Sequence, residues 1–167
     1  MATTKSTSVT NYDATPQKMN DKHTFRARRK VIREVIEVAA ADDDGQIYAI
    51  APVHSTDVIE DIMVMNDAIA DGTDYDIGLY ETTANGAAVV DANAYADAVS
   101  MASARVARTS LGFEGGGRDI ANAKNRVWQD AGASADTAKD YVLALTANTV
   151  GTVAGTIVVD VLILEGD

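Results

Sequence analysis

The C-terminal part of the chain alternates apolar side chains with a period of two, and this pattern constrains the fold most strongly. The alternating apolar positions are Tyr141, Leu143, Leu145, Ile157, Val159, Val161 and Ile163. Successive strand residues point to opposite faces of a sheet, so the period predicts two strands. On the other face of the second strand only Asp160 is strongly polar. We therefore expect that strand in the middle of a sheet, buried on both sides. Asn, Thr and Gly at 147–154 predict an antiparallel hairpin between the two strands.

Residues 31–39 are read as a further strand because β-branched side chains dominate them. Their apolar spacing also fits one face of a helix, and this alternative stays open. Asp42-Asp43-Asp44-Gly45 predicts a hairpin turn into a strand at 46–51, which Pro52 should end.

Residues 58–66 form another apolar segment of strand length. In 75–80, Tyr75, Ile77 and Leu79 alternate with Asp76 and Gly78, which is typical of a half-buried strand. Asn85-Gly86 predicts a turn after it.

Two segments favour helix. Residues 92–104 are rich in Ala and follow Asp91 as a possible N-cap. Residues 119–131 have helical spacing around Ile120, Ala123, Val127 and Trp128, which predicts core packing for Trp128. A Gly-rich stretch at 112–117 separates them.

Several short strands spaced by turns predict a mainly β fold, an antiparallel β-sandwich that is jelly-roll-like, with one or two short helices. The chain of 167 residues is close to the length of one domain, and its apolar residues are mostly aliphatic, with 5% aromatic. It has no Cys, so disulfides and thiolate chemistry are excluded. No apolar run is long enough to span a bilayer, and we expect no membrane partner.

Charge divides the chain into two parts. Residues 1–33 carry eight basic and two acidic side chains, a net charge of +6, whereas the remainder carries −17. The first 24 residues are polar, with little to bury, and cannot offset their own ordering entropy. We expect an extended basic N-terminal arm at 1–30 and a sandwich domain at 31–167. The arm residues predicted to contact a capsid or a sister subunit are Lys18, Lys22, Arg26, Arg28, Arg29, Lys30 and Arg33.

The acidic body argues against nucleic-acid binding, because affinity for phosphates comes from dense Lys and Arg. Two alternatives for the arm remain open. It could be a solubilising tail that folds back on its own acidic body, or it could contact packaged nucleic acid, which its charge allows but the acidic body disfavours.

Residues that could support catalysis or cofactor binding have simpler interpretations. His54 is the only imidazole outside the arm, and Ser55 beside it is best read as a turn. Gly115-Gly116-Gly117-Arg118 lacks the order of a phosphate-binding loop. The run at 42–45 fails the EF-hand spacing, although a weak divalent site is an alternative to a solvated turn. Asp67, Asp71, Asp74 and Asp76 flank a turn, which explains them as surface residues. We expect no enzyme activity, cofactor or metal.

The order of several segments carries a resemblance. These segments are 45–52 (GQIYAIAP), 57–62 (DVIEDI), 66–69 (NDAI), 72–80 (GTDYDIGLY), the Ala-rich 91–103, Val127-Trp128 and 154–161 (AGTIVVDV). Together they resemble the small head-decoration, or cement, proteins of tailed bacteriophages over residues 30–165. The motifs specify strands and turns, and the arm has no counterpart in the resemblance.

The resemblance implies a β-sandwich, usually oligomeric, bound to the outer surface of a major capsid protein lattice. We therefore expect a non-enzymatic virion structural protein on the capsid surface, a homo-oligomer whose partner is that lattice. The alternative is a receptor- or carbohydrate-binding β-sandwich module of a phage fibre or tail, which the low aromatic content disfavours.

Overall fold

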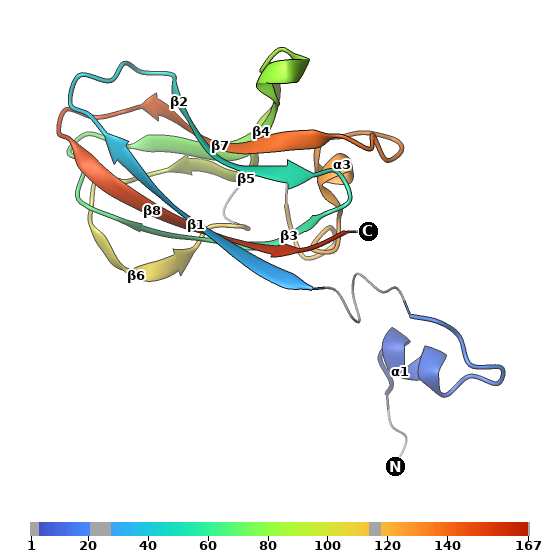
Figure 1. Ribbon diagram of the computed structural model, residues 1–167. Coiled ribbons are helices and arrows are strands. Elements are labelled where there is room, and N and C mark those ends of the chain that lie inside the picture. The colour runs from blue at the N-terminus through green and yellow to red at the C-terminus, as the bar shows by residue number, and fades with distance from the viewer. Residues whose placement is uncertain (1–3, 21–27, 114–117, 167) are drawn as a thin grey trace.

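The computed structural model describes residues 4–20, 28–113 and 118–166, and its strands form two sheets packed face to face (Figure 1). The strands are β1 (Arg29–Val38), β2 (Gln46–His54), β3 (Val58–Asn66), β4 (Asp74–Glu81), β5 (Val89–Val99), β6 (Arg105–Ser110), β7 (Asp140–Thr149) and β8 (Gly155–Leu164). Among the described residues, three short helices accompany them: α1 (Thr7–Tyr12), η1 (Thr83–Asn85) and α3 (Val127–Asp130). The apolar core lies between the sheets.

Sheet A has the strand order β1-β8-β3-β6 and sheet B the order β2-β7-β4-β5, with every pair antiparallel. The chain crosses from one sheet to the other between most consecutive strands, which is the arrangement of a jelly roll. This confirms the predicted mainly β, jelly-roll-like sandwich. Strands were also predicted correctly at 31–39, at 58–66 and in the C-terminal part, and η1 with Gly86 confirms the turn at Asn85-Gly86.

Both predicted hairpins are wrong. β1 pairs with β8, and β2 pairs with β7, so the turn at 42–45 joins two sheets. The loop at 147–154 likewise joins β7 in sheet B to β8 in sheet A. Turn residues signal that the chain reverses, but partner choice follows from which strands bury their apolar faces together.

β8 lies in the interior of sheet A, as predicted, between β1 and β3. Its inward side chains are fully buried: Ile157, Val159, Val161 and Ile163. Pro52 does not end β2 but lies within it, paired with Val142. β2 is an edge strand, where the missing N–H of a proline can face away from the neighbouring strand.

β4 was expected to be half-buried, but residues 75–80 are buried throughout. β4 lies between β7 and β5, and β5 passes directly over Gly78. A Cβ at that position would stand 2.1 Å from the Asp91 carbonyl oxygen, so only glycine admits this approach.

The two predicted helices are largely wrong. Residues 92–104 belong mostly to β5, because Ala94, Tyr95 and Ala96 bury their side chains in the sandwich and burial overrides the helix propensity of alanine. Of 119–131, only the single turn of α3 is helical, and Ile120 is almost fully exposed. Val127 is buried, whereas Trp128 is half-buried.

No described helix is long and apolar enough to cross a membrane. Residues 7–12 form α1 where extended chain was expected, with the Ser6 side chain capping its start. Figure 1 shows α1 apart from the two sheets, while the C-terminus lies beside the beginning of β1.

Candidate interface around the basic N-terminal segment

The seven predicted contact residues fall into three groups. Lys18 is exposed, and its backbone N–H donates to the Asn11 carbonyl at 3.0 Å. Lys22 and Arg26 lie outside the described residues. Arg28, Arg29, Lys30 and Arg33 lie on or just before β1, which begins at Arg29. The structure therefore brings the last four together on the sandwich.

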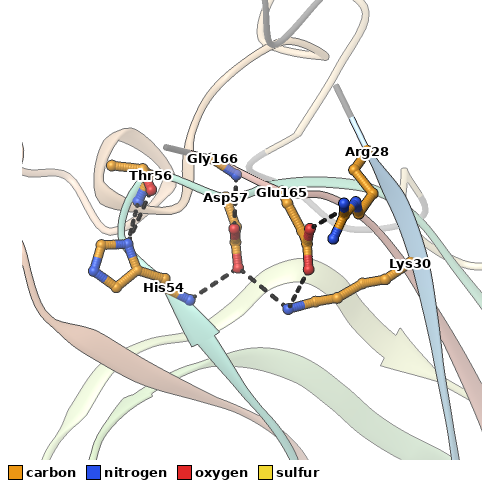
Figure 2. A network of polar contacts seen from close by, with 7 residues as sticks. All are labelled: Arg28, Lys30, His54, Thr56, Asp57, Glu165 and Gly166. Carbon is orange, nitrogen blue, oxygen red and sulfur yellow. Dashed lines mark hydrogen bonds and ion pairs between the residues drawn. The ribbon is translucent and has the colours of Figure 1, made fainter. Parts of the chain in front are cut away.

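A polar network holds the chain where it enters the sandwich (Figure 2). Arg28 Nε lies 3.9 Å from Glu165 Oε2, and Lys30 Nζ lies 3.9 Å from both Glu165 Oε1 and Asp57 Oδ2. The Glu165 N–H donates to the Arg28 carbonyl at 2.9 Å. The network thus ties the start of β1 to the end of the chain that follows β8.

Asp57 is the buried centre of that network, with its side chain 6% exposed. Its carboxylate accepts the backbone N–H groups of His54 at 3.1 Å and Gly166 at 2.9 Å. Since both bonds come from the backbone, Asp57 fixes the β2–β3 turn and the C-terminus whether or not Lys30 is near. Arg28 and Lys30 add ion pairs that are partly exposed to solvent, so their contribution to stability is modest.

Arg33 on β1 and Arg108 on β6 converge on Asp160 from opposite edges of sheet A. Arg33 donates to both carboxylate oxygens, Nε at 2.6 Å and Nη2 at 2.8 Å, and Arg108 Nε lies 2.9 Å from Oδ2. Asp160 is 2% exposed, while each arginine side chain is about half exposed. The hydrogen bond and charge of Asp160 raise the pKa of Arg33. This bidentate geometry is what makes arginine favoured over lysine for carboxylates.

Arg29 donates to Glu60 on β3. That hydrogen bond, followed by the charge of Glu60, raises the pKa of Arg29. Each of the four cations at 28–33 therefore has a carboxylate partner in its own sandwich. For this part of the segment, the arrangement is the one expected of a chain that folds back on its acidic body.

Residues 4–20 are held together by their own hydrogen bonds. Lys5 Nζ donates to Asp13 Oδ2 at 2.8 Å, Asn11 Nδ2 donates to Asn20 Oδ1 at 2.9 Å, and Asn20 Nδ2 donates to the Ser8 carbonyl at 3.2 Å. Within the described parts of the chain, these residues make no hydrogen bond or ion pair to the sandwich. The apolar side chains of Val9, Tyr12 and Met19 remain exposed.

The charge pattern of the sequence predicts the cations but not the carboxylates that bind them: Asp57, Glu60, Asp160 and Glu165. Asp160 carried a signal, because it is the one strongly polar residue on its face of β8. A lone carboxylate in an apolar strand needs a cationic partner, and a basic residue on a neighbouring strand supplies it. The other three carry no such pattern.

The residues considered for catalysis take part in local structure. His54 Nδ1 lies 2.9 Å from Thr56 Oγ1, whereas Ser55 Oγ donates to Asp136 Oδ1 at 2.6 Å. His54 and Ser55 are therefore bonded to different partners. The hydrogen bonds from Ser55 and the Ala138 N–H lower the pKa of Asp136. Gly115 to Gly117 lie outside the described residues.

The acidic runs also have structural partners. Asp42 accepts from the Tyr48 hydroxyl at 2.7 Å and the Ala39 N–H at 2.9 Å, and these bonds lower the pKa of Asp42. Asp44 accepts the Val150 N–H at 2.9 Å. Asp67, Asp71, Asp74 and Asp76 each accept a hydrogen bond within the sandwich. Among the described residues, no group of three potential ligands is placed to hold a metal ion.

Arg118 is a buried cation, although its place at the end of a glycine run gives no sign of burial. Its guanidinium carbon lies 4.9 Å from the Phe113 ring centre and 5.4 Å from that of Tyr95. Nη2 donates to the Ile59 carbonyl. The Tyr95 hydroxyl in turn donates to Asp130 at 3.1 Å. Arg118 thus packs the segment before α3 against β3 and β5.

Comparison with known proteins gives a limited result. No family model matches the chain, and no curated protein matches it. A structure described as the capsid of Ralstonia phage GP4 is 13% identical, aligns over 86% of this chain and 88% of its own, and has a TM-score of 0.49. A structure described as the cyanophage Pam1 capsid asymmetric unit is 13% identical, aligns over 98% and 99%, and has a TM-score of 0.47. Both TM-scores lie below 0.5.

Proposed function

We propose that this chain is a non-enzymatic virion structural protein, a decoration or cement protein that binds the outer surface of a phage head and stabilises it. Its partner would be the major capsid protein lattice. The observation that carries the proposal is an acidic jelly-roll sandwich preceded by a segment, 4–20, whose described hydrogen bonds are all internal. The resemblance of residues 30–165 to head-decoration proteins supplies the class of partner.

The basic residues of the segment differ in their contacts, and this difference supports a narrower proposal for the attachment site. The four cations at 28–33 pair with carboxylates of their own sandwich. We therefore assign contact with the shell to the part before Arg28, through Lys18, Lys22 and Arg26, since the other cation there, Lys5, pairs with Asp13. A segment that orders on binding loses some affinity to that ordering but can follow a long path over a partner surface.

Attachment to a lattice does not require strong single contacts. Each subunit meets an equivalent site, so a weak sandwich contact and a weak segment contact on one chain reinforce each other through effective concentration. Exposed charge contacts should weaken with salt, because screening acts within about 8–10 Å at ordinary ionic strength.

The first experiment asks whether the chain copurifies with intact particles, and in what copy number. Particles that lack the chain, obtained by deleting its gene, then serve as the binding partner. We expect the purified protein to occupy such particles at a defined copy number. A chain that never associates with particles would contradict the proposal, and specific binding on a glycan array would support the carbohydrate-binding alternative instead.

The second experiment tests the segment. Deletion of residues 1–24, and separately Lys18→Gln with Lys22→Gln and Arg26→Gln, should leave the melting temperature nearly unchanged while reducing binding to particles, and the loss of affinity relative to wild type should be largest at low salt. Lys124→Gln, an exposed lysine of the sandwich, is the control for loss of one charge. Variants that still decorate particles fully in moderate salt would remove the segment from the attachment mechanism.

A further inference from the structure

The four sheet edges are not equally protected against pairing with another strand. β2 carries Pro52 and a register shift at Ala49/Ala51, and β5 has three register shifts against β4. β6 has six residues and a register shift of its own. Proline, bulges and short length are the usual devices that keep an edge from accepting a foreign strand. β1 has ten residues and pairs with β8 without any shift, so its edge is long and regular.

The backbone of β1 offers hydrogen-bonding groups along this edge. The Glu165 N–H donates to the Arg28 carbonyl across the β1–β8 pair. Backbone groups alternate in direction along a strand, so the even-numbered residues of β1 face β8 and the odd-numbered residues face outward. The outward residues are Arg29, Val31, Arg33, Val35 and Glu37. In the described parts of the chain no strand lies beyond them.

The charges of β1 are ordered by sign along the strand. Its first half carries Arg29, Lys30 and Arg33, and its second half carries Glu34 and Glu37. A strand with this order is complementary to itself when a second copy runs antiparallel, because basic residues then meet acidic ones. The same order would place like charges side by side in a parallel pair. The edge therefore fits a second copy of this chain.

We propose that β1 pairs antiparallel with β1 of a second subunit about a two-fold axis through Arg33. In this register Arg29 lies opposite Glu37 of the partner subunit, and Val31 lies opposite Val35 of the partner subunit. Each occurs twice by symmetry, and all belong to the outward-facing set. The two four-stranded A sheets become one continuous sheet.

The pairing accounts for two exposed apolar residues. Val31 is 56% exposed and Val35 58% exposed on the outer face of sheet A, where a solvent-facing sheet normally presents polar side chains. Paired across the axis, the valines cover each other. On the other face Lys30 lies diagonal to Glu34 of the partner subunit, within reach of a long side chain.

One like-charge pair remains, Arg33 opposite Arg33 of the partner subunit on the axis. Each Arg33 already donates two hydrogen bonds to its own Asp160. Those bonds aim the guanidinium along sheet A toward β8, away from the edge. The neighbouring carboxylate thus offsets the repulsion that two free arginines would feel at this spacing.

Charge reversal tests the interface on purified full-length protein, with sedimentation velocity as the measurement. Wild type should be dimeric. Arg29→Glu alone and Glu37→Arg alone should each weaken the dimer by about tenfold or more, because two attractive pairs become repulsive. The double variant R29E/E37R should recover it, and a mixture of the two single variants should form a heterodimer. Asp97→Arg, an exposed acid on β5, is the control and should leave the dimer unchanged.

Recovery of the dimer in the double variant would separate an effect on dimerisation from an effect on folding. The double variant loses the Arg29–Glu60 contact within its own subunit as fully as Arg29→Glu does, so loss of that contact could not explain the monomer. Val35→Pro removes an outward N–H that β8 does not use, so it should also give a folded monomer, checked by its melting temperature. A monomeric wild type, or an oligomer indifferent to these variants, would overturn the proposal. Neither result depends on particle binding, so this inference and the proposed function fail separately.

Discussion

Shortening Ile157 to Ala tests whether β8 is the central strand of sheet A. Ile157 is fully buried and lies opposite Ile36 on β1 and Asn66 on β3. The three carbon atoms that Ile has beyond Ala cost about 2.4 kcal/mol to expose, at about 0.8 kcal/mol per methylene. The cavity left in a packed core adds to this, so we expect a loss of about 3 kcal/mol in the free energy of unfolding.

For a chain of this length, 1 kcal/mol shifts the melting temperature by about 2–4 °C, which predicts a decrease of about 6–12 °C for Ile157→Ala. Val159→Ala and Val161→Ala, with fewer atoms removed, should each cost about 1–3 kcal/mol. Val35→Ala on the outer face is the control, and in the monomer it should change stability by less than about 0.5 kcal/mol. Thermal and urea unfolding measure all four. If the three β8 variants were neutral, or if Val35→Ala cost as much as Ile157→Ala, the assignment of the inner and outer faces of sheet A would be wrong.

Three further predictions follow from single contacts. Gly78→Ala should destabilise the fold by about 3 kcal/mol or more in urea unfolding, because its Cβ would meet the backbone of β5 at 2.1 Å. Asn66 donates to three backbone carbonyls, those of Asp67, Met101 and Ser103, so Asn66→Asp should lower the melting temperature more than Asn66→Ala does, since a carboxylate would face those oxygens. Burial raises the pKa of Asp130, so its stabilising contribution is present at low pH and is lost as pH rises through that pKa. Asp130→Asn should therefore be more stable than wild type at pH 7, with the difference closing below about pH 4 in paired melts.

The strands could be predicted where side chains alternate or β-branched residues dominate, as in β3, β7 and β8. The hairpins could not, because turn residues such as Asp42 to Gly45 report a reversal and say nothing of the partner strand. The Ala-rich segment at 92–104 was misread for a related reason. Alanine favours helix in isolation, but here its small side chain suits a strand that passes closely over Gly78.

The cations of the candidate site could be predicted from the sequence, but most of their carboxylate partners could not. A count of charges located the basic segment, and the polarity of Asp160 marked one place where a cation could bind. The other anchors are set by tertiary structure, since Asp57 and Glu165 meet Lys30 only because β8 returns beside β1. No local pattern in the sequence brings the C-terminus to the start of the first strand.

These contacts change what the split in charge implies for binding. The +6 of residues 1–33 includes Arg28, Arg29, Lys30 and Arg33, whose charges the sandwich already balances. Cations that already pair with their own carboxylates have few counterions to release when a partner binds. The salt dependence of the proposed attachment should therefore follow the cations before Arg28, and it should be shallower than the net charge of +6 suggests. The four cations also lie on or just before β1, which pairs with β8 without a register shift. The four residues that a charge count marks as part of a binding site thus pair in the structure with carboxylates of their own sandwich.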